Sequence, residues 1–231
     1  MNTRLRVFVR KRLPFLIPLS RRLRFSGKTP EQVFTEEFRR NRRVWKDRDS
    51  ASGPGSSLAQ TEAVRRALPG LLRELGCRSL LDAPCGDFFW MKLLELDVDY
   101  IGGDIVAELV RENQRRYGDA RRRFVHLDLL QDELPRADLV LCRDCLVHLS
   151  FEHIRQALAN IRKSGCRYLL TTTFVDRDAN ADILTGLWRP VNLQLPPFGF
   201  PEPVRLIDEE SPLPDQRDKR LGLWKVEDIP A

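Results

Sequence analysis

Apolar and polar residues alternate in blocks along the middle of the chain, between residues 76 and 173. Short apolar runs bounded by turn residues are typical of buried strands, and longer stretches with helical periodicity are typical of helices. Strands are predicted at 78–82, 99–103, 123–127, 138–142 and 167–173. Helices are predicted at 89–96, 106–117 and 151–163, with Ser150 as the cap of the last. This alternation indicates a parallel sheet that helices cover on both faces.

Two further helices are predicted before this region. The stretch 29–32 (TPEQ) pairs a capping threonine with proline at the first helical position and glutamine at the third, so a helix should run over 29–47. The stretch 57–60 (SLAQ) has the same type of capping pattern and predicts a helix over 57–75, which the Pro-Gly pair at 69–70 should disturb.

The alternation ends after residue 174. Five prolines fall within 186–203, so this segment cannot form a regular helix. Two late strands are predicted at 203–207 and 221–226, and they would pair as an antiparallel hairpin. The fold class expected is therefore α/β: a doubly wound, mostly parallel seven-stranded sheet with an antiparallel C-terminal hairpin strand, plus N-terminal helices.

The positive charge of the chain is concentrated at its N-terminus. The 231 residues carry a net charge of +6, but residues 1–25 hold eight basic residues and no acid, and the rest holds 31 basic against 33 acidic residues. The folded part is therefore not a basic surface for nucleic acid, and no nucleic-acid partner is expected. The basic arm is either a solvated tail or a weak contact to an anionic membrane surface. Its apolar run at 13–19 is too short to span a bilayer.

The five cysteines are an odd number, and four of them lie in or beside strand-like runs. Buried thiols of this kind favour a reducing compartment over a disulfide framework. We therefore expect a cytoplasmic protein, peripheral at the inner membrane surface if the arm binds there.

Acidic residues follow four of the predicted strands, namely Asp82, Asp104, Asp128 and Asp144. Ligands of open α/β sheets bind beyond the carboxyl ends of the strands, so these carboxylates should border one site. Asp104 comes 22 residues after Asp82, the spacing at which a carboxylate accepts hydrogen bonds from both hydroxyls of a ribose.

The turn after the first strand, DAPCGDFFW, is poor in glycine. A dinucleotide needs glycines there for close approach of its pyrophosphate and free N–H groups to bind the anion. Pro84 removes one such donor, and Phe88 stands where another glycine would be wanted. The turn favours a cofactor with a ribose and an adenine but no phosphate, and S-adenosylmethionine is such a cofactor.

Four motifs in order resemble those of the class I S-adenosylmethionine-dependent methyltransferases: LLDAPCGDF, YIGGDI, FVHLDLL and ADLVLCRDCLVHLSFEHIRQAL. The resemblance covers residues 76–173 and implies a Rossmann-like methyltransferase core over 76–231. The remaining parts would be a basic arm (1–28) and a helical segment (29–75). Within the core, the Pro-rich insert 174–203 would be either a lid over the acceptor pocket or a spacer.

The resemblance assigns roles to residues at the ends of the strands. Asp82, Ala83, Cys85 and Gly86 would surround the methionine end of the cofactor. Asp104 with Ile105 would hold ribose and adenine, Asp128 with Leu129 would border the adenine amine, and the backbone near Cys142 and Arg143 would line the sulfonium side. Arg143 is also a candidate for binding an acidic acceptor. The first turn departs from the family at Pro84 and Phe88, so Phe88, Phe89 or Trp90 would form either a pocket wall or part of the core.

Acceptor-side roles fall on two groups of residues. Asp144 and His148 lie one helical turn apart after the fourth strand and are the candidate catalytic pair, with His148 either a general base or a packing residue. Trp90, Trp188, Arg189 and Asn192 are the candidate substrate contacts. The connector 52–57 would either offer N–H groups to a carboxylate or serve as a flexible link. No metal site is expected, because Cys142 and Cys145 have no second pair at ligand spacing.

The sequence therefore predicts a methyltransferase acting on a small molecule, a sugar or other hydroxylated metabolite, with O-methylation favoured. A Rossmann-like module that binds the cofactor or a nucleotide without catalysis is the main alternative. An NAD-dependent oxidoreductase is disfavoured by the glycine-poor turn. A nucleic-acid methyltransferase is disfavoured because the fourth strand lacks the Asn/Asp-Pro-Pro-aromatic tetrapeptide common among enzymes that methylate base amines. The acceptor and the oligomeric state are not determined by the sequence.

Overall fold

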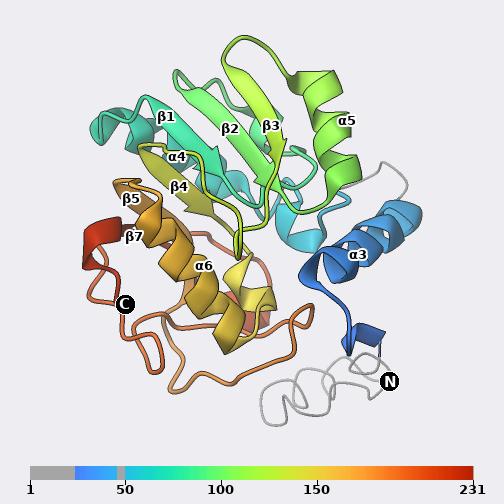
Figure 1. Ribbon diagram of the computed structural model, residues 1–231. Helices are drawn as coiled ribbons and strands as arrows, with labels where there is room; N and C mark the ends of the chain where they lie inside the picture. The colour runs from blue at the N-terminus through green and yellow to red at the C-terminus, as the bar shows by residue number, and fades with distance from the viewer. Residues whose placement is uncertain (1–23, 46–49, 231) are drawn as a thin grey trace.

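A single twisted sheet lies at the centre of the computed structural model, which describes residues 24–45 and 50–230 (Figure 1). Its seven strands follow the order β3-β2-β1-β4-β5-β7-β6. The strands are β1 (Ser79–Asp82), β2 (Asp99–Asp104), β3 (Arg122–His126), β4 (Leu139–Cys142), β5 (Tyr168–Phe174), β6 (Arg205–Asp208) and β7 (Lys219–Lys225). Strands β1 to β5 pair in parallel, and β7 runs antiparallel to both of its neighbours. The predicted fold class is confirmed. The predicted arm lies largely outside the described residues.

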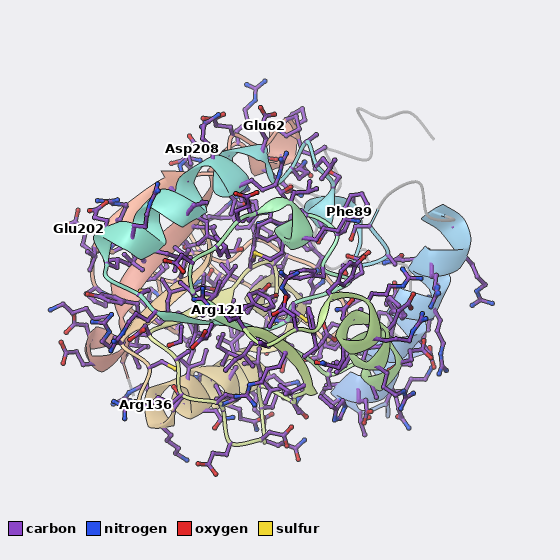
Figure 2. The ribbon with its side chains drawn as sticks, turned by 90° about the horizontal axis from the view of Figure 1, so that it is seen from above. Glu62, Phe89, Arg121, Arg136, Glu202 and Asp208 are labelled. Carbon is purple, nitrogen blue, oxygen red and sulfur yellow. The ribbon has the colours of Figure 1, made fainter. Side chains whose placement is uncertain are left out.

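Helices cover both faces of this sheet because successive strand residues point to opposite sides. Leu80 packs with α4 (Glu62–Glu74) and α5 (Ala107–Tyr117), whereas its neighbour Leu81 packs with α6 (Phe151–Lys163). Helix α4 also lies beside the far edge of the sheet, where Arg205 of β6 pairs with Glu74. Figure 2 shows Glu62 and Asp208, from these two elements, on the same side of the molecule. Among the described residues, no helix has the length and apolar character needed to cross a membrane.

The N-terminal helix α3 (Pro30–Trp45) begins where the capping pattern predicts. Thr29 N–H donates to Gln32 Oε1 at 3.0 Å, and Gln32 N–H donates to Thr29 Oγ1 at 3.3 Å, a reciprocal capping pair. The helix lies beside α5 (Figure 1), to which two arginines connect it: Arg39 pairs with Glu108 and Arg42 with Glu112.

Two predicted helices differ from those observed. The stretch 89–96 forms only a short 3-10 turn at Met91–Leu93. The second N-terminal helix begins at Glu62 rather than at Ser57, and it continues through Pro69 without a break. Proline costs such a helix one backbone hydrogen bond. The apolar face that α4 buries outweighs that loss, because the whole helix packs on the sheet.

The Pro-rich insert packs into the core over much of its length. Val191, Leu193, Phe198 and Phe200 are buried in the same cluster as α6. Backbone bonds to β5 fix it, since Phe174 N–H donates to the carbonyl oxygen of Val191 at 2.8 Å. Its prolines therefore shape an irregular layer of the core, and only its first part reaches the ligand cavity described below.

Candidate active site

A cavity of about 520 Å³ opens at the carboxyl ends of β1, β2 and β4. The order of the sheet reverses between β1 and β4, and ligands of open α/β sheets bind at this point. Its walls come from the turn after β1, the ends of β2 and β3, the segment after β4, the loop at 51–56 and helix α3. Its volume lies in the range of pockets that hold small molecules and cofactors.

The turn after β1 is fixed by backbone bonds to both neighbouring strands. Ala83 N–H donates to the carbonyl of Leu141 on β4 at 2.9 Å, and Cys85 N–H donates to that of Gly103 on β2 at 2.8 Å. The chain then reverses at Gly86, whose φ of 55° lies in the left-handed region that favours glycine. The turn thus places the backbone of residues 82–86, all of which line the cavity, directly over the strand ends.

Asp82 and Asp104 are buried beside this turn and have few cations near them. Tyr100 donates its hydroxyl hydrogen to Asp82 at 2.6 Å, whereas Asp104 accepts from the N–H groups of Gly86 at 3.0 Å and Val106 at 2.9 Å. Burial raises the pKa of Asp82 to about 7 and the pKa of Asp104 to about 6. Each oxygen of Asp104 retains a lone pair for a further donor.

A loop from the N-terminal segment docks onto the same turn. Asp87 accepts hydrogen bonds from Ser50 Oγ at 2.8 Å, the Ala51 N–H at 2.7 Å and Ser52 Oγ at 3.2 Å. Ser52 lies so close to Gly86 that any β-carbon at position 86 would collide with it. The connector predicted over 52–57 therefore forms a fixed wall of the cavity over 52–56. The N–H groups of Ser52 and Ser56 bond within the loop itself.

The ends of β2 and β3 form the opposite wall. Ile105, Asp128 and Leu129 all line the cavity, as predicted from the motifs. Asp128 accepts from the N–H of Leu130 at 2.9 Å, which holds the loop after β3 in a tight turn. Asp104 and Asp128 thus stand on neighbouring strand ends with Ile105 between them on the lining.

Arg143 lines the cavity but has no N–H group left for a ligand. Its Nε donates to Glu209 at 2.9 Å, and its two terminal nitrogens bond to Gly55 O at 2.8 Å, to Gln60 O at 3.2 Å and again to Glu209. The fifth donor faces Asp144, whose Oδ2 lies 3.2 Å from Nη1. Four of the five N–H donors of this guanidinium therefore bond within the protein, and the fifth lies against a carboxylate. The expectation that Arg143 binds an acidic acceptor is therefore wrong.

Asp144 stands next to Arg143 in a left-handed backbone conformation, with φ of 52°. Its N–H donates to Thr172 Oγ1 at 2.9 Å, and its Oδ2 accepts from Lys219 Nζ at 2.7 Å. Burial alone would raise the pKa of Asp144, but Lys219 and Arg143 lower it to about 2. A carboxylate held ionised by two cations is a very weak base. The prediction of Asp144 as half of a catalytic acid–base pair is therefore corrected.

His148 lines the cavity at the end of a short 3-10 turn, Leu146–His148. Its Nδ1 lies 2.9 Å from the carbonyl oxygen of Leu187. Burial lowers its pKa, so the ring is neutral at pH 7 and must donate from Nδ1 to that carbonyl. Its Nε2 then carries a lone pair, the form that a general base requires.

Three of the predicted site residues lie outside the cavity lining. Cys142 is fully buried in the cluster around α6, because residues of β4 alternate between the two faces of the sheet. Arg189 donates to the carbonyl oxygens of Leu146 and Leu149 and so holds the turn that carries His148. The side chain of Asn192 bonds to backbone groups of the insert: its Nδ2 donates to the carbonyl oxygen of Val175 at 3.4 Å, and its Oδ1 accepts from the N–H of Gln194 at 3.0 Å. These three predictions are corrected.

The aromatic residues divide between cavity and core. Trp90 and Trp188 line the cavity, whereas Phe88 packs in a core cluster with Tyr100, Tyr117 and Phe124. Phe88 is therefore a core residue, and its φ of 56° turns its ring away from the ligand space. Phe89 is not part of the lining either; Lys92 lies over its ring.

Comparisons with known proteins agree with this geometry. No family model matches the chain. Proteins of Mycobacterium bovis and Mycobacterium tuberculosis, both named uncharacterized methyltransferases, are 34% identical to it over 129 residues, which cover 53% of this chain and 61% of theirs. The chain thus spans less than two thirds of the length of these relatives.

Two solved structures share the architecture. The 1,6-didemethyltoxoflavin-N1-methyltransferase of Burkholderia thailandensis, with bound 1,6-didemethyltoxoflavin and S-adenosylhomocysteine, has a TM-score of 0.55 at 19% identity over 84% of this chain and 86% of that one. Human N-acetylserotonin methyltransferase, in complex with S-adenosylmethionine, has a TM-score of 0.51 at 13% identity, covering 84% of this chain and 56% of that chain. The chain has the class I methyltransferase fold. The fold that the resemblance implied is therefore confirmed.

Several lining residues of this methyltransferase fold were missed by sequence reasoning. Helix α3 contributes Phe34, Glu37 and Arg40 to the cavity, although no motif marks them. Lys219, which bonds Asp144, lies on β7 and is fully buried. The one available signal was a lysine at the start of this strand, and nothing in the sequence says which carboxylate it meets.

Proposed function

We propose that this protein is an S-adenosylmethionine-dependent methyltransferase acting on a small hydroxylated molecule, with transfer to oxygen. The observation that carries the proposal is the charge of the cavity lining around the buried carboxylate of Asp104. The lining holds five carboxylates (Glu37, Asp82, Asp104, Asp128 and Asp144) and two guanidinium groups (Arg40 and Arg143). Since Arg143 directs its N–H groups to the protein, this surface repels a pyrophosphate and favours a ligand that brings hydroxyl donors and positive charge.

The residues of the cavity fit S-adenosylmethionine part by part. The free lone pairs of Asp104 match the two ribose hydroxyls. Ile105 and Leu129 offer apolar surface to adenine, with Asp128 beside its amine, while Cys85 and Gly86 border the methionine part. When bound, the cofactor supplies an electrophilic methyl group carried on a sulfonium.

His148 serves in this proposal as the base that removes the proton of the acceptor hydroxyl. Its neutral ring holds a lone pair on Nε2, and the Leu187 carbonyl fixes the ring orientation. Trp188 and Phe34 provide apolar walls on the acceptor side. Alignment of acceptor and methyl group by these walls would supply the rest of the rate enhancement.

The test is transfer of a labelled methyl group from the cofactor to pools of hydroxylated metabolites. The His148→Gln variant should lose about 100-fold to 1,000-fold in turnover at unchanged S-adenosylhomocysteine affinity, the usual contribution of a general base. His153→Gln is the matched control, because His153 bonds Thr185 and does not line the cavity. Tight binding of NAD without binding of S-adenosylhomocysteine would refute the proposal. Cofactor binding by the wild type without transfer to any acceptor would instead indicate a non-catalytic module.

We also propose a cytoplasmic location, with the basic arm over residues 1–28 resting on an anionic membrane surface. Its eight positive charges within residues 1–25 support this. Co-sedimentation with vesicles containing phosphatidylserine should weaken in high salt and on deletion of residues 1–23. Binding to neutral vesicles of equal strength would contradict it.

A further inference from the structure

The four carbonyl oxygens of residues 146–149, the segment that carries His148, all accept hydrogen bonds from the insert. The first three of these residues form a short 3-10 turn. The N–H of Gly186 donates to the carbonyl of His148 at 2.8 Å, and the N–H of Arg189 donates to that of Val147 at 3.1 Å. The side chain of Arg189 bonds the other two, at the beginning and the end of the segment. Because a turn this short leaves most of its carbonyls without partners inside it, the insert fixes the position of the segment.

Arg189 is a buried cation that bonds carbonyl oxygens and, among the described residues, forms no ion pair. Only 3% of the residue is exposed. Its Nη1 donates to the Leu146 carbonyl at 2.8 Å, its Nη2 to that of Leu149 at 2.7 Å and its Nε to that of Ala181 at 3.1 Å. Burial lowers the pKa of this guanidinium to about 10, so it stays charged at neutral pH. A neutral amide would bond carbonyls without the cost of a buried charge, which indicates that the charge itself has a role.

The same stretch of the insert orients the ring of His148 and forms a wall of the cavity. The carbonyl oxygen of Leu187 lies 2.9 Å from Nδ1 of the ring. Trp188, the next residue, lines the cavity, and its ring packs edge-on against Phe174 of β5 with 6.0 Å between the ring centroids. The three consecutive residues 187–189 therefore set the orientation of the ring, the acceptor-side wall and the anchors of the turn together. Such a unit keeps a base and an acceptor aligned with each other.

The charge of Arg189 also acts on the protonation of His148. Burial lowers the pKa of His148, and the nearby charge of Arg189 lowers it further. The hydrogen bond to Leu187 and the carboxylates of Asp144 after β4 and Glu37 on α3 act in the opposite direction. The cations paired with these two carboxylates are Arg24, Arg40, Arg143 and Lys219. Without Arg189 the ring would therefore take up a proton at higher pH, and a protonated ring cannot act as a base.

We propose that Arg189 is a positioning residue for methyl transfer: its guanidinium fixes the segment 146–149 so that Nε2 of His148 faces the acceptor hydroxyl. The inference rests on the proposed function, since it needs His148 to take the proton of that hydroxyl. The proton passes to Nε2 as the oxygen accepts the methyl group, and the electron pair of the broken bond stays on sulfur. Arg189 lies outside the cavity lining, so it acts on the reaction through His148. Its positive charge adds a second effect, because it opposes protonation of the ring.

The first measurement is the titration of His148 by proton NMR, which needs no acceptor. The chain holds three histidines, so the resonance of His148 is the one missing in His148→Gln. In Arg189→Met the pKa of His148 should rise above its wild-type value, because a nearby cation is removed. In Arg189→Lys the charge remains, so the pKa should change less.

The second measurement is turnover with an acceptor found by the labelled-methyl screen. Arg189→Lys should lose about tenfold to 100-fold in turnover, because one ammonium group cannot bond the carbonyls at both ends of the segment. Arg189→Met should lose at least as much, with its pH–rate profile shifted to higher pH. The affinity for S-adenosylhomocysteine should stay within about twofold in both variants, because Arg189 does not line the cavity.

Arg177→Lys is the matched control, since Arg177 belongs to the same insert and bonds Asp218 instead of the turn. It should leave the titration of His148 and the turnover unchanged. If Arg189→Met does not fold, Arg189→Lys retains the stem and the charge and carries the test through turnover and cofactor affinity.

Unchanged turnover in Arg189→Lys, or an equal loss of turnover and of S-adenosylhomocysteine affinity, would overturn the positioning role. An unchanged titration of His148 in Arg189→Met would overturn the role of the charge. Full turnover in His148→Gln, or failure of the wild type to bind S-adenosylhomocysteine, would refute the proposed function instead, so the two failures are distinguishable.

Discussion

Buried carboxylates at the two ends of the cavity have pKa values that are shifted in opposite directions. At the ends of β1 and β2, Asp82 and Asp104 are held by hydroxyl and N–H donors, and burial raises the pKa of both. At the end of β4, Asp144 is buried beside Arg143 and Lys219, which lower its pKa to about 2. Burial acts in the same direction at both ends, so the neighbouring cations decide the outcome.

This difference indicates which end of the cavity a ligand would complete. The β4 end is electrostatically complete before any ligand arrives, and its geometry is fixed by the protein alone. The β1–β2 end is incomplete, because within the described residues neither of its carboxylates forms an ion pair and Asp104 has unused lone pairs. A ligand with hydroxyl donors and positive charge would complete this end, and for this reason the cavity favours an adenosine sulfonium over a dinucleotide.

Removing a cation from the charged network of Arg143, Asp144, Glu209 and Lys219 at the end of β4 should have the largest effect, and the effect should be on stability. Replacing Lys219 by methionine leaves Asp144 and Glu209 with a single cation and should lower the free energy of unfolding by about 3–5 kcal/mol, measured by urea denaturation. Lys225→Met is the matched control on the same strand, where the side chain is 51% exposed, and it should change stability by less than about 0.5 kcal/mol. Equal effects of the two substitutions would show that the network adds nothing.

Removing the charge at the incomplete end should weaken ligand binding. Asp104→Asn loses one acceptor oxygen and should lower the affinity for S-adenosylhomocysteine by about tenfold to 100-fold. The affinity for 5′-methylthioadenosine, which has the same adenosine and thioether without the amino-acid tail, should fall by the same factor because both ligands carry the ribose. Asp99→Asn serves as the control at the opposite end of β2, where the side chain is 70% exposed and pairs with Arg121. Unchanged affinity in Asp104→Asn would exclude the ribose role.

The same comparison predicts that one buried acid destabilises the fold. The pKa of Asp82 is raised to about 7, so the folded state binds more protons than the unfolded state between about pH 4 and pH 7. Stability due to this group therefore falls as the pH rises through that window. Asp82→Asn should raise stability by about 2 kcal/mol at pH 8 and by less at pH 5, measured by denaturation at both values. Destabilisation at pH 8 would contradict the argument.

The smallest expected effect is a pH dependence of nucleoside binding. With its pKa at about 6, Asp104 is largely protonated at pH 5 and ionised at pH 8. The affinity for 5′-methylthioadenosine should therefore be about tenfold lower at pH 5 than at pH 8. The dependence should disappear in Asp104→Asn, and a wild-type affinity that does not change over this range would show that the ionised form is not required.

The pattern of apolar residues and the position of acidic residues at the strand ends were enough to predict much of the site. The alternation of apolar runs located the five parallel strands to within about three residues at either end, because buried strands need uninterrupted apolar sequence. The two C-terminal strands were located equally well from their own short runs. Asp82 and Asp104 end their strands, and Asp128 and His148 lie in the segments that follow β3 and β4, so parallel pairing was enough to place them on the cavity. The capping pairs likewise fixed the starts of α3 and α6, since their hydrogen bonds span three residues.

The roles of side chains that meet across long sequence separations were decided by the tertiary structure alone. The sequence placed Arg143 and Asp144 at a strand end. It did not reveal that Glu209 would accept hydrogen bonds from Arg143, or that Lys219 would keep Asp144 ionised. Nor did it show that the side chains of Arg189 and Asn192 bond to backbone groups or that Cys142 faces α6. Chemical type and order are local properties, whereas pairing, saturation and pKa depend on which distant groups are buried together.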